Sequence, residues 1–294
     1  MKTTTLFLTG GNGFIGRNIQ EAFSDRYTII APTHRELDLL DIEKVGEFLK
    51  AHPSDVLIHA ANVGGTRKSD PTLNYLNPNL RMFVNLLRCR KYFKKIIFFG
   101  SGAEYNKEFP LIDIKEENFG RSIPKDDYGL YKFLCSKLLE NDKDAVILRI
   151  FGLYGKYEDY DIRFISQSIC KSIVGVPITI NQNVYFDYLY IDDFMKILEY
   201  FLTHTPKYRV YNIGVGQKVD LYTIAQKIIA ISKSNKPIVI KNKNLGKEYT
   251  CNIERLKNEI KELYFTPLDE ALKKLYSYYE QNKSIIDMSS LEKF

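Results

Sequence analysis

The sequence has few cysteines and histidines and no long apolar run. Four cysteines and four histidines occur among 294 residues, and no two cysteines have Cys-x-x-Cys spacing. These shortages exclude a disulfide scaffold, and we expect no metal site. No run of about 18 apolar residues occurs, and the apolar run after Met1 stops at Gly10, too short for a secretory signal. We therefore expect a cytoplasmic protein with no membrane partner.

What is present fits a globular protein of one or two domains. Hydrophobic residues make up 45% and charged residues 27% of the chain, enough for a core that needs no metal or disulfide. The formal net charge is +6, but lysines and arginines are interleaved with acids along the chain. This pattern is typical of a solvated surface, so we expect no nucleic-acid partner.

The first half of the chain alternates short β-branched runs with longer helical patterns. Strands are predicted at 4–9, 27–31, 56–59, 95–100 and 145–151. Helices are predicted at 14–23, 45–49, 80–87 and 128–139. This order indicates an α/β fold with a Rossmann-like, doubly wound parallel sheet.

After residue 151 the alternation loosens. Strands are predicted at 178–180, 187–190 and 210–213, and helices at 164–173, 191–202, 221–232 and 268–279. We divide the chain into a nucleotide-binding domain, 1–151, and a smaller C-terminal α/β lobe, 152–294, that mainly binds substrate. Parts near 184–214 are expected to return to the first domain.

A glycine-rich loop directly follows the first predicted strand. It reads Thr9-Gly10-Gly11-Asn12-Gly13-Phe14-Ile15-Gly16, and a helical pattern begins inside it. Glycines permit a tight turn, a close approach to a pyrophosphate and close packing of helix on strand, and the helix N-terminus presents free N–H groups. The loop therefore predicts a dinucleotide site at Gly10, Gly13, Phe14, Ile15 and Gly16.

The end of the second predicted strand lacks the acidic residue that would bind the adenosine ribose. Pro32-Thr33-His34-Arg35-Glu36 stands there instead, with Arg35 suited to a 2′-phosphate. We therefore favour NADP(H) over NAD(H) as the cofactor. The alternative is that Arg35 is an ordinary exposed loop arginine.

A serine and a Tyr-x-x-x-Lys motif follow in the order needed for carbonyl reduction. Ser101 ends the fourth predicted strand, and Tyr128 and Lys132 lie one turn apart on the next helix. A tyrosine exchanges its proton near neutral pH only when a nearby cation stabilises the phenolate. Tyr279 and Lys283 have the same spacing, but there a solvated helix face explains it better. We predict Ser101, Tyr128 and Lys132 as the catalytic residues.

At this point the chain resembles the extended short-chain dehydrogenase/reductase family over nearly its full length. The resemblance rests on the glycine loop, Ser101, Tyr128 and Lys132, and on the segments 59–61, 149–155, 187–193 and 212–214. It implies that Lys132 also binds the nicotinamide ribose, and that further cofactor-site residues are Asp38, Leu39, Ala60, Ala61, Asn79 and Phe151. The alternatives are that Asp38 forms a turn, that Ala60 and Ala61 only pack at a strand end, and that Asn79 bonds its own loop.

Within that family, residues 35–41 and 60–65 look like GDP-fucose synthases, which epimerise and then reduce a 4-keto nucleotide sugar. Their proton-transfer cysteine would fall at Ala103, and no histidine lies between Phe151 and Thr203. The resemblance thus implies NADPH-dependent reduction of the C4 carbonyl of a 4-keto-6-deoxy nucleotide sugar, without C3/C5 epimerisation. Dehydration is disfavoured, because Glu104 lies one residue from the acidic position of the dehydratases and extended backbone would turn it away.

Three questions stay open at the level of sequence. A nucleotide-sugar 4-epimerase with tightly bound NAD also needs only the same three catalytic residues, and a non-catalytic NAD(P)H-binding protein is a further alternative. The arginine with which the family often binds the substrate phosphates is replaced by Phe186, with Arg163, Lys171 or Arg209 as substitutes. The resemblance also implies a homodimer.

Overall fold

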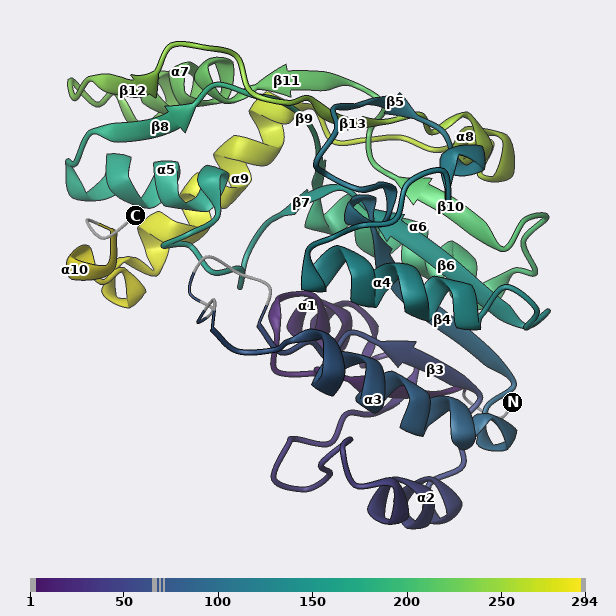
Figure 1. Cartoon of the computed structure of the whole chain (residues 1–294). Coiled ribbons are helices and arrows are strands. Elements are labelled where there is room, and N and C mark those ends of the chain that lie inside the picture. Colours follow the sequence, from purple (N-terminus) through teal and green to yellow (C-terminus); the bar gives the residue numbers. More distant parts are fainter. Residues whose placement is uncertain (1–3, 65–67, 69, 71, 292–294) are drawn as a thin grey trace.

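The computed structural model describes residues 4–64, 68, 70 and 72–291. Its main sheet has six parallel strands in the order β10-β6-β4-β3-β1-β2 (Figure 1). The strands are β1 (Thr5–Thr9), β2 (Thr28–Ile30), β3 (Val56–His59), β4 (Lys95–Ser101), β6 (Ala145–Ile150) and β10 (Val210–Ile213). The predicted α/β class and doubly wound parallel sheet are confirmed.

Helices cover both faces of this sheet because its strands are apolar on both sides. In β1, Leu6 and Leu8 enter one core cluster and Phe7 enters the other, since successive side chains point to opposite faces. Helices α2, α3 and α4 lie on the face in front in Figure 1, and α1 and α6 lie behind. These helices are α1 (Phe14–Phe23), α2 (Ile42–Ala51), α3 (Leu76–Arg88), α4 (Asp127–Leu138) and α6 (Ile191–Thr203).

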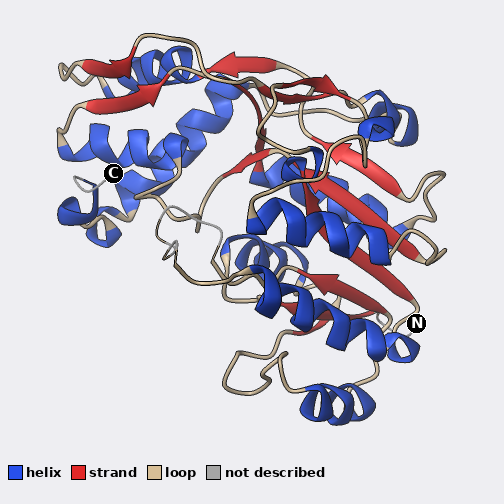
Figure 2. Cartoon of the chain, viewed as in Figure 1, coloured by secondary structure: helices blue, strands red, loops and turns tan. Residues whose placement is uncertain are grey.

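The rest of the chain forms two smaller sheets and a helical layer at one end of the main sheet (Figures 1 and 2). One sheet has the order β11-β9-β13-β5, with β7 also paired to β9; the other is β12-β8. Their strands are β5 (Leu111–Ile114), β7 (Gly152–Tyr154), β8 (Ile178–Gln182), β9 (Tyr185–Tyr190), β11 (Lys218–Asp220), β12 (Ile238–Asn242) and β13 (Tyr249–Cys251). The remaining α-helices are α5 (Phe164–Val174), α7 (Leu221–Ser232), α8 (Glu254–Glu259), α9 (Leu268–Gln281) and α10 (Met288–Leu291).

Strand β10 belongs to the second half of the sequence but completes the main sheet beside β6. Short 3₁₀ turns connect several elements: η1 (Arg90–Tyr92), η2 (Gly102–Tyr105), η3 (Glu116–Asn118) and η4 (Lys283–Ile285). Among the described residues, no helix combines the length and the apolar character needed to cross a bilayer. The division into domains at residue 151 stays a prediction.

Candidate active site

A cavity of about 720 Å³ lies where the carboxyl ends of the main-sheet strands meet the smaller sheets. Its wall on the main-sheet side includes the glycine loop after β1 and the ends of β3, β4 and β6. The opposite wall includes residues of α5, β8, β9 and β13. Ligands of open parallel sheets bind at this edge, so the topology places the cavity where a site is expected.

The glycine loop fits a pyrophosphate because two of its glycines have no room for a side chain. Gly10 has φ +72°, and a β-carbon there would lie 2.7 Å from the Ala60 carbonyl carbon. A β-carbon on Gly16 would overlap the carbonyl oxygen of Gly10. Helix α1 then begins after Gly13 with no side-chain cap and no acidic residue in its first turn. Its first N–H groups are therefore left for an anion in the cavity.

Ser101 is fixed at the end of β4 by the turn that follows it. Its hydroxyl oxygen accepts a hydrogen bond from the Ala103 N–H at 3.2 Å, and its own N–H donates to Glu104 Oε1 at 2.8 Å. These two bonds form a capping box for η2. Ser101 is only 6% exposed, and it lines the cavity.

Tyr128 and Lys132 come from the first turns of α4. Asp126 caps this helix by accepting from the Gly129 N–H at 3.0 Å, which fixes where the helix begins and so where Tyr128 lies. Lys132 Nζ donates to the Phe99 carbonyl at 2.7 Å and lies 5.9 Å from the centre of the Tyr128 ring. Both side chains line the same cavity as Ser101.

Lys132 keeps its charge although it is buried. Burial lowers its pKa, but the neighbouring phenols of Tyr131 and Tyr128 raise it, and the net pKa lies above the ordinary lysine value. His59, at the end of β3, is neutral instead: burial and then the Lys132 charge lower its pKa to about 3. Lys132 is therefore a buried cation close to Tyr128.

Glu104 lies behind the cavity wall and not in it. Its Oε2 accepts hydrogen bonds from Ser136 Oγ at 2.8 Å and Arg149 Nε at 2.7 Å, and the residue is fully buried. The expected extended backbone at this position was wrong, because η2 is a 3₁₀ turn. Glu104 is nevertheless absent from the cavity lining, where the buried Ala103 lies instead.

Residues 6–214 match the model of the NAD dependent epimerase/dehydratase family. The chain belongs to this family. Its members are NAD(P)-dependent oxidoreductases, so the protein is an enzyme that uses a nicotinamide cofactor, and the glycine loop has the geometry to hold it.

Individual relatives of the family span most of the chain. A GDP-L-colitose synthase from Yersinia pseudotuberculosis is 27% identical over 252 residues, 78% of this chain and 81% of that protein. A GDP-L-fucose synthase from Azorhizobium caulinodans is 28% identical over 277 residues, 82% and 88% of the two chains. The structure of a GDP-mannoheptose C4 reductase from Campylobacter jejuni with NADP bound matches with a TM-score of 0.80 at 17% identity, over 95% and 99% of the chains. That structural match shows the fold.

Most of the predicted cofactor-site residues line the cavity. They are Gly10, Gly13, Phe14, Ile15, Gly16, Ala60, Lys132 and Phe151. None of the four histidines, all of which lie in the described ranges, lines it. In the described part of the chain, no three His, Cys, Asp or Glu side chains converge as metal ligands.

Five predicted cofactor-site residues lie outside the cavity lining. Asp38 forms a turn with the Leu40 N–H, and Leu39 packs in the core. The Ala61 N–H donates to Thr9 Oγ1, and Arg35 is exposed. Asn79 braces the loop before its helix, because its side chain exchanges hydrogen bonds with the backbone of Val63 at 2.8 and 2.7 Å. Their roles toward the cofactor stay predictions.

Two residues of the opposite wall were missed by the sequence reasoning. Glu158 is buried in the loop before α5, where its carboxylate accepts from the Ser166 hydroxyl, and burial raises its pKa to about 7. Tyr249 reaches the cavity from β13. Neither residue stands in a motif or at the end of a long periodic element, so no signal in the sequence marks it.

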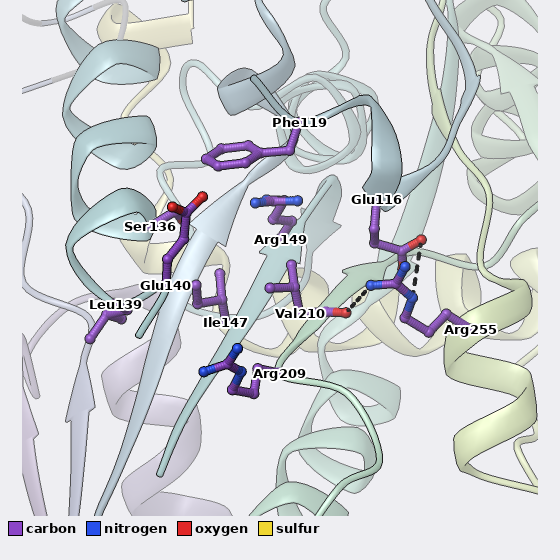
Figure 3. Close-up of a pocket in the computed structure, with 10 residues that line it drawn as sticks. All are labelled: Glu116, Phe119, Ser136, Leu139, Glu140, Ile147, Arg149, Arg209, Val210 and Arg255. Atoms are coloured by element: carbon purple, nitrogen blue, oxygen red, sulfur yellow. Dashed lines mark hydrogen bonds and ion pairs between the residues drawn. The ribbon is translucent and has the colours of Figure 1, made fainter. Parts of the chain in front are cut away.

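Of the three bases considered as substitutes for the missing arginine, only Arg163 lines the cavity. Arg209 lines a second cavity, of about 170 Å³, with Arg149 and Arg255 (Figure 3). Two of these arginines have partners: Arg149 bonds Glu104, and Arg255 bonds Glu116 and the Val210 carbonyl (Figure 3).

Proposed function

We propose that the protein reduces the C4 carbonyl of a 4-keto-6-deoxy nucleotide sugar with NADPH, without epimerisation at C3 or C5. One observation carries the proposal: Ser101, Tyr128 and Lys132 line one cavity together with Ala103. By the family resemblance, Ala103 stands where the proton-transfer cysteine would be. The relatives named above act on GDP-linked sugars by their names, so GDP is the first nucleotide to test.

Each residue has a distinct part in this reaction. NADPH, when bound, supplies the hydride that adds to C4. Tyr128 donates its proton to the carbonyl oxygen, so that the C=O group becomes CH–OH. Ser101 holds the same oxygen by a hydrogen bond. Lys132 stabilises the phenolate that forms when Tyr128 gives up its proton, and it binds the nicotinamide ribose.

The cofactor preference rests on the turn after β2. Arg35 is exposed in this turn, free to meet a 2′-phosphate. The carboxylate of the acidic neighbour Glu36 already accepts a hydrogen bond from the Thr33 N–H at 2.7 Å. Tighter binding of NADPH than of NADH supports the Arg35 assignment, and equal binding or a preference for NADH refutes it.

The substrate phosphates need cations on the opposite wall. Arg163 and Lys247 both line the cavity there, and we assign them to the diphosphate in place of the arginine that Phe186 replaces. A homodimer stays part of the proposal from the family resemblance.

The test is to purify the protein, identify any nucleotide that accompanies it, and supply 4-keto-6-deoxy sugars on GDP, dTDP, CDP and UDP. Oxidation of NADPH with formation of a C4 alcohol supports the proposal. Isomerisation of a nucleotide sugar without net oxidation would instead show a 4-epimerase, and binding of NAD(P)H without turnover of any sugar would show a non-catalytic protein.

A further inference from the structure

Tyr249 lies beside the proposed catalytic serine although it comes from a distant part of the chain. It begins β13, a three-residue strand that pairs with β5 and β9 in the second sheet. Its ring packs against Phe151 at 4.9 Å and Phe186 at 5.7 Å between centroids. The ring is thereby held against the wall of the cavity.

The phenol oxygen of Tyr249 points at the turn that holds Ser101. A β-carbon on Gly102, the next residue, would lie 2.5 Å from this oxygen, so the phenol approaches the turn closely only because residue 102 is glycine. The phenol therefore lies beside the Ser101 side chain, whose hydrogen-bonding group acts to lower the pKa of Tyr249. Burial raises the pKa of Tyr249 more than Ser101 lowers it, so the phenol keeps its proton and can donate it.

The hydrogen bonds of Ser101 decide where its own proton can go. A serine hydroxyl has one proton to donate and two lone pairs that accept. The Ala103 N–H already donates to the oxygen at 3.2 Å. If Tyr249 donates to the second lone pair, both acceptor positions are filled, and the hydroxyl proton is directed to a further acceptor.

We propose that Tyr249 is a positioning residue that orients the Ser101 hydroxyl, so that its proton points at the substrate carbonyl oxygen. This inference rests on the proposed carbonyl reduction. Tyr249 itself acts through Ser101 and does not contact the reacting atoms.

The experiment is a double-mutant cycle of Tyr249→Phe and Ser101→Ala in the full-length protein. The assay measures turnover of the 4-keto sugar that the nucleotide screen identifies as a substrate. Tyr249→Phe keeps the ring and its packing but removes one hydrogen bond, which corresponds to about a tenfold loss of kcat. The Kd for NADPH, the KM for the sugar and the melting temperature should stay unchanged. Tyr264→Phe is the matched control, because Tyr264 is 66% exposed and outside the cavity lining.

The inference is tested by whether the effects of the two substitutions on kcat are additive. If Tyr249 acts through Ser101, the double variant has the kcat of Ser101→Ala alone, since the hydroxyl to be oriented is already gone. A further loss in the double variant overturns the inference, because Tyr249 then acts independently. Full turnover of Tyr249→Phe beside a loss in Ser101→Ala also overturns it but leaves the proposed function standing. Full turnover of Ser101→Ala instead refutes the proposed role of Ser101.

Discussion

The two walls of the cavity are built in different ways. On the main-sheet side, Gly10 stands in a tight loop, Ser101 at the end of a long buried strand and Tyr128 at the start of a helix. On the opposite side, the lining residues Glu158 and Tyr249 come from a loop and from a three-residue strand. The first wall is defined by backbone geometry, which local sequence controls, and the second by side chains that only tertiary pairing brings together.

The largest expected effect tests whether the chemistry belongs to the main-sheet wall. Tyr128→Phe removes the proposed proton donor while the ring keeps its place in α4. We expect kcat to fall about 10²- to 10⁴-fold, with little change in the Kd for NADPH, measured by single-turnover kinetics and by fluorescence titration. Turnover close to that of the Tyr264→Phe control would remove Tyr128 from the mechanism.

The second prediction concerns Glu158 on the opposite wall and the way in which the stability of the fold depends on pH. The pKa of Glu158 is raised to about 7 by burial from an ordinary value of 4.5, although Ser166 and Arg163 act to lower it. A raised carboxyl pKa means that the folded state loses stability as pH rises from about 4.5 to about 7, by on the order of 3 kcal/mol in total. Glu158→Gln cannot ionise and can still accept from Ser166.

We therefore expect Glu158→Gln to raise the free energy of unfolding at pH 8 and to change it little at pH 5. Urea denaturation at the two pH values measures the difference. An equal change at both pH values would show that the pKa of Glu158 is not raised into this range. A loss of stability at pH 8 would show that the ionised carboxylate stabilises the fold.

The smallest expected effects are changes in the free energy of unfolding at two glycines of the main-sheet half. A β-carbon on Gly16 would overlap the Gly10 carbonyl, whereas one on Gly46 in α2 meets no atom within 4 Å. Gly16→Ala should lower the free energy of unfolding by about 1–3 kcal/mol through overpacking and weaken NADPH binding. Gly46→Ala should raise it by about 0.5–1 kcal/mol, because alanine is the better helix former. Equal effects in thermal denaturation would contradict the account of the loop.

The sequence predicted the main-sheet half well, for reasons that particular elements show. The periodic segments α1, β3 and β10 have the predicted bounds, and so does α7 outside this half. Helix α3 begins at Leu76, four residues before its prediction, because Pro78 lies in its first turn, where proline is tolerated but hides the helical pattern. Apolar periodicity marks where such elements lie, and their ends then locate Ser101 and Tyr128.

The opposite wall could not be predicted in the same way. Strand β13 spans Tyr249–Cys251 and exists only because it pairs with β5 and β9, which are far away in the sequence. A three-residue strand carries too few side chains to show a period. The surroundings of Glu158 and Tyr249, and therefore their burial and hydrogen bonds, follow from that long-range pairing.

The most direct test of the proposed reduction follows isotopes through one turnover. The enzyme is given a 4-keto-6-deoxy sugar on GDP with NADPH that carries deuterium at the transferred position, and a parallel reaction uses unlabelled NADPH in D₂O. We predict deuterium at C4 of the product in the first reaction and none at C3 or C5 in the second, as read by NMR. Solvent deuterium at C3 or C5, or a product with no label at C4, would contradict the account.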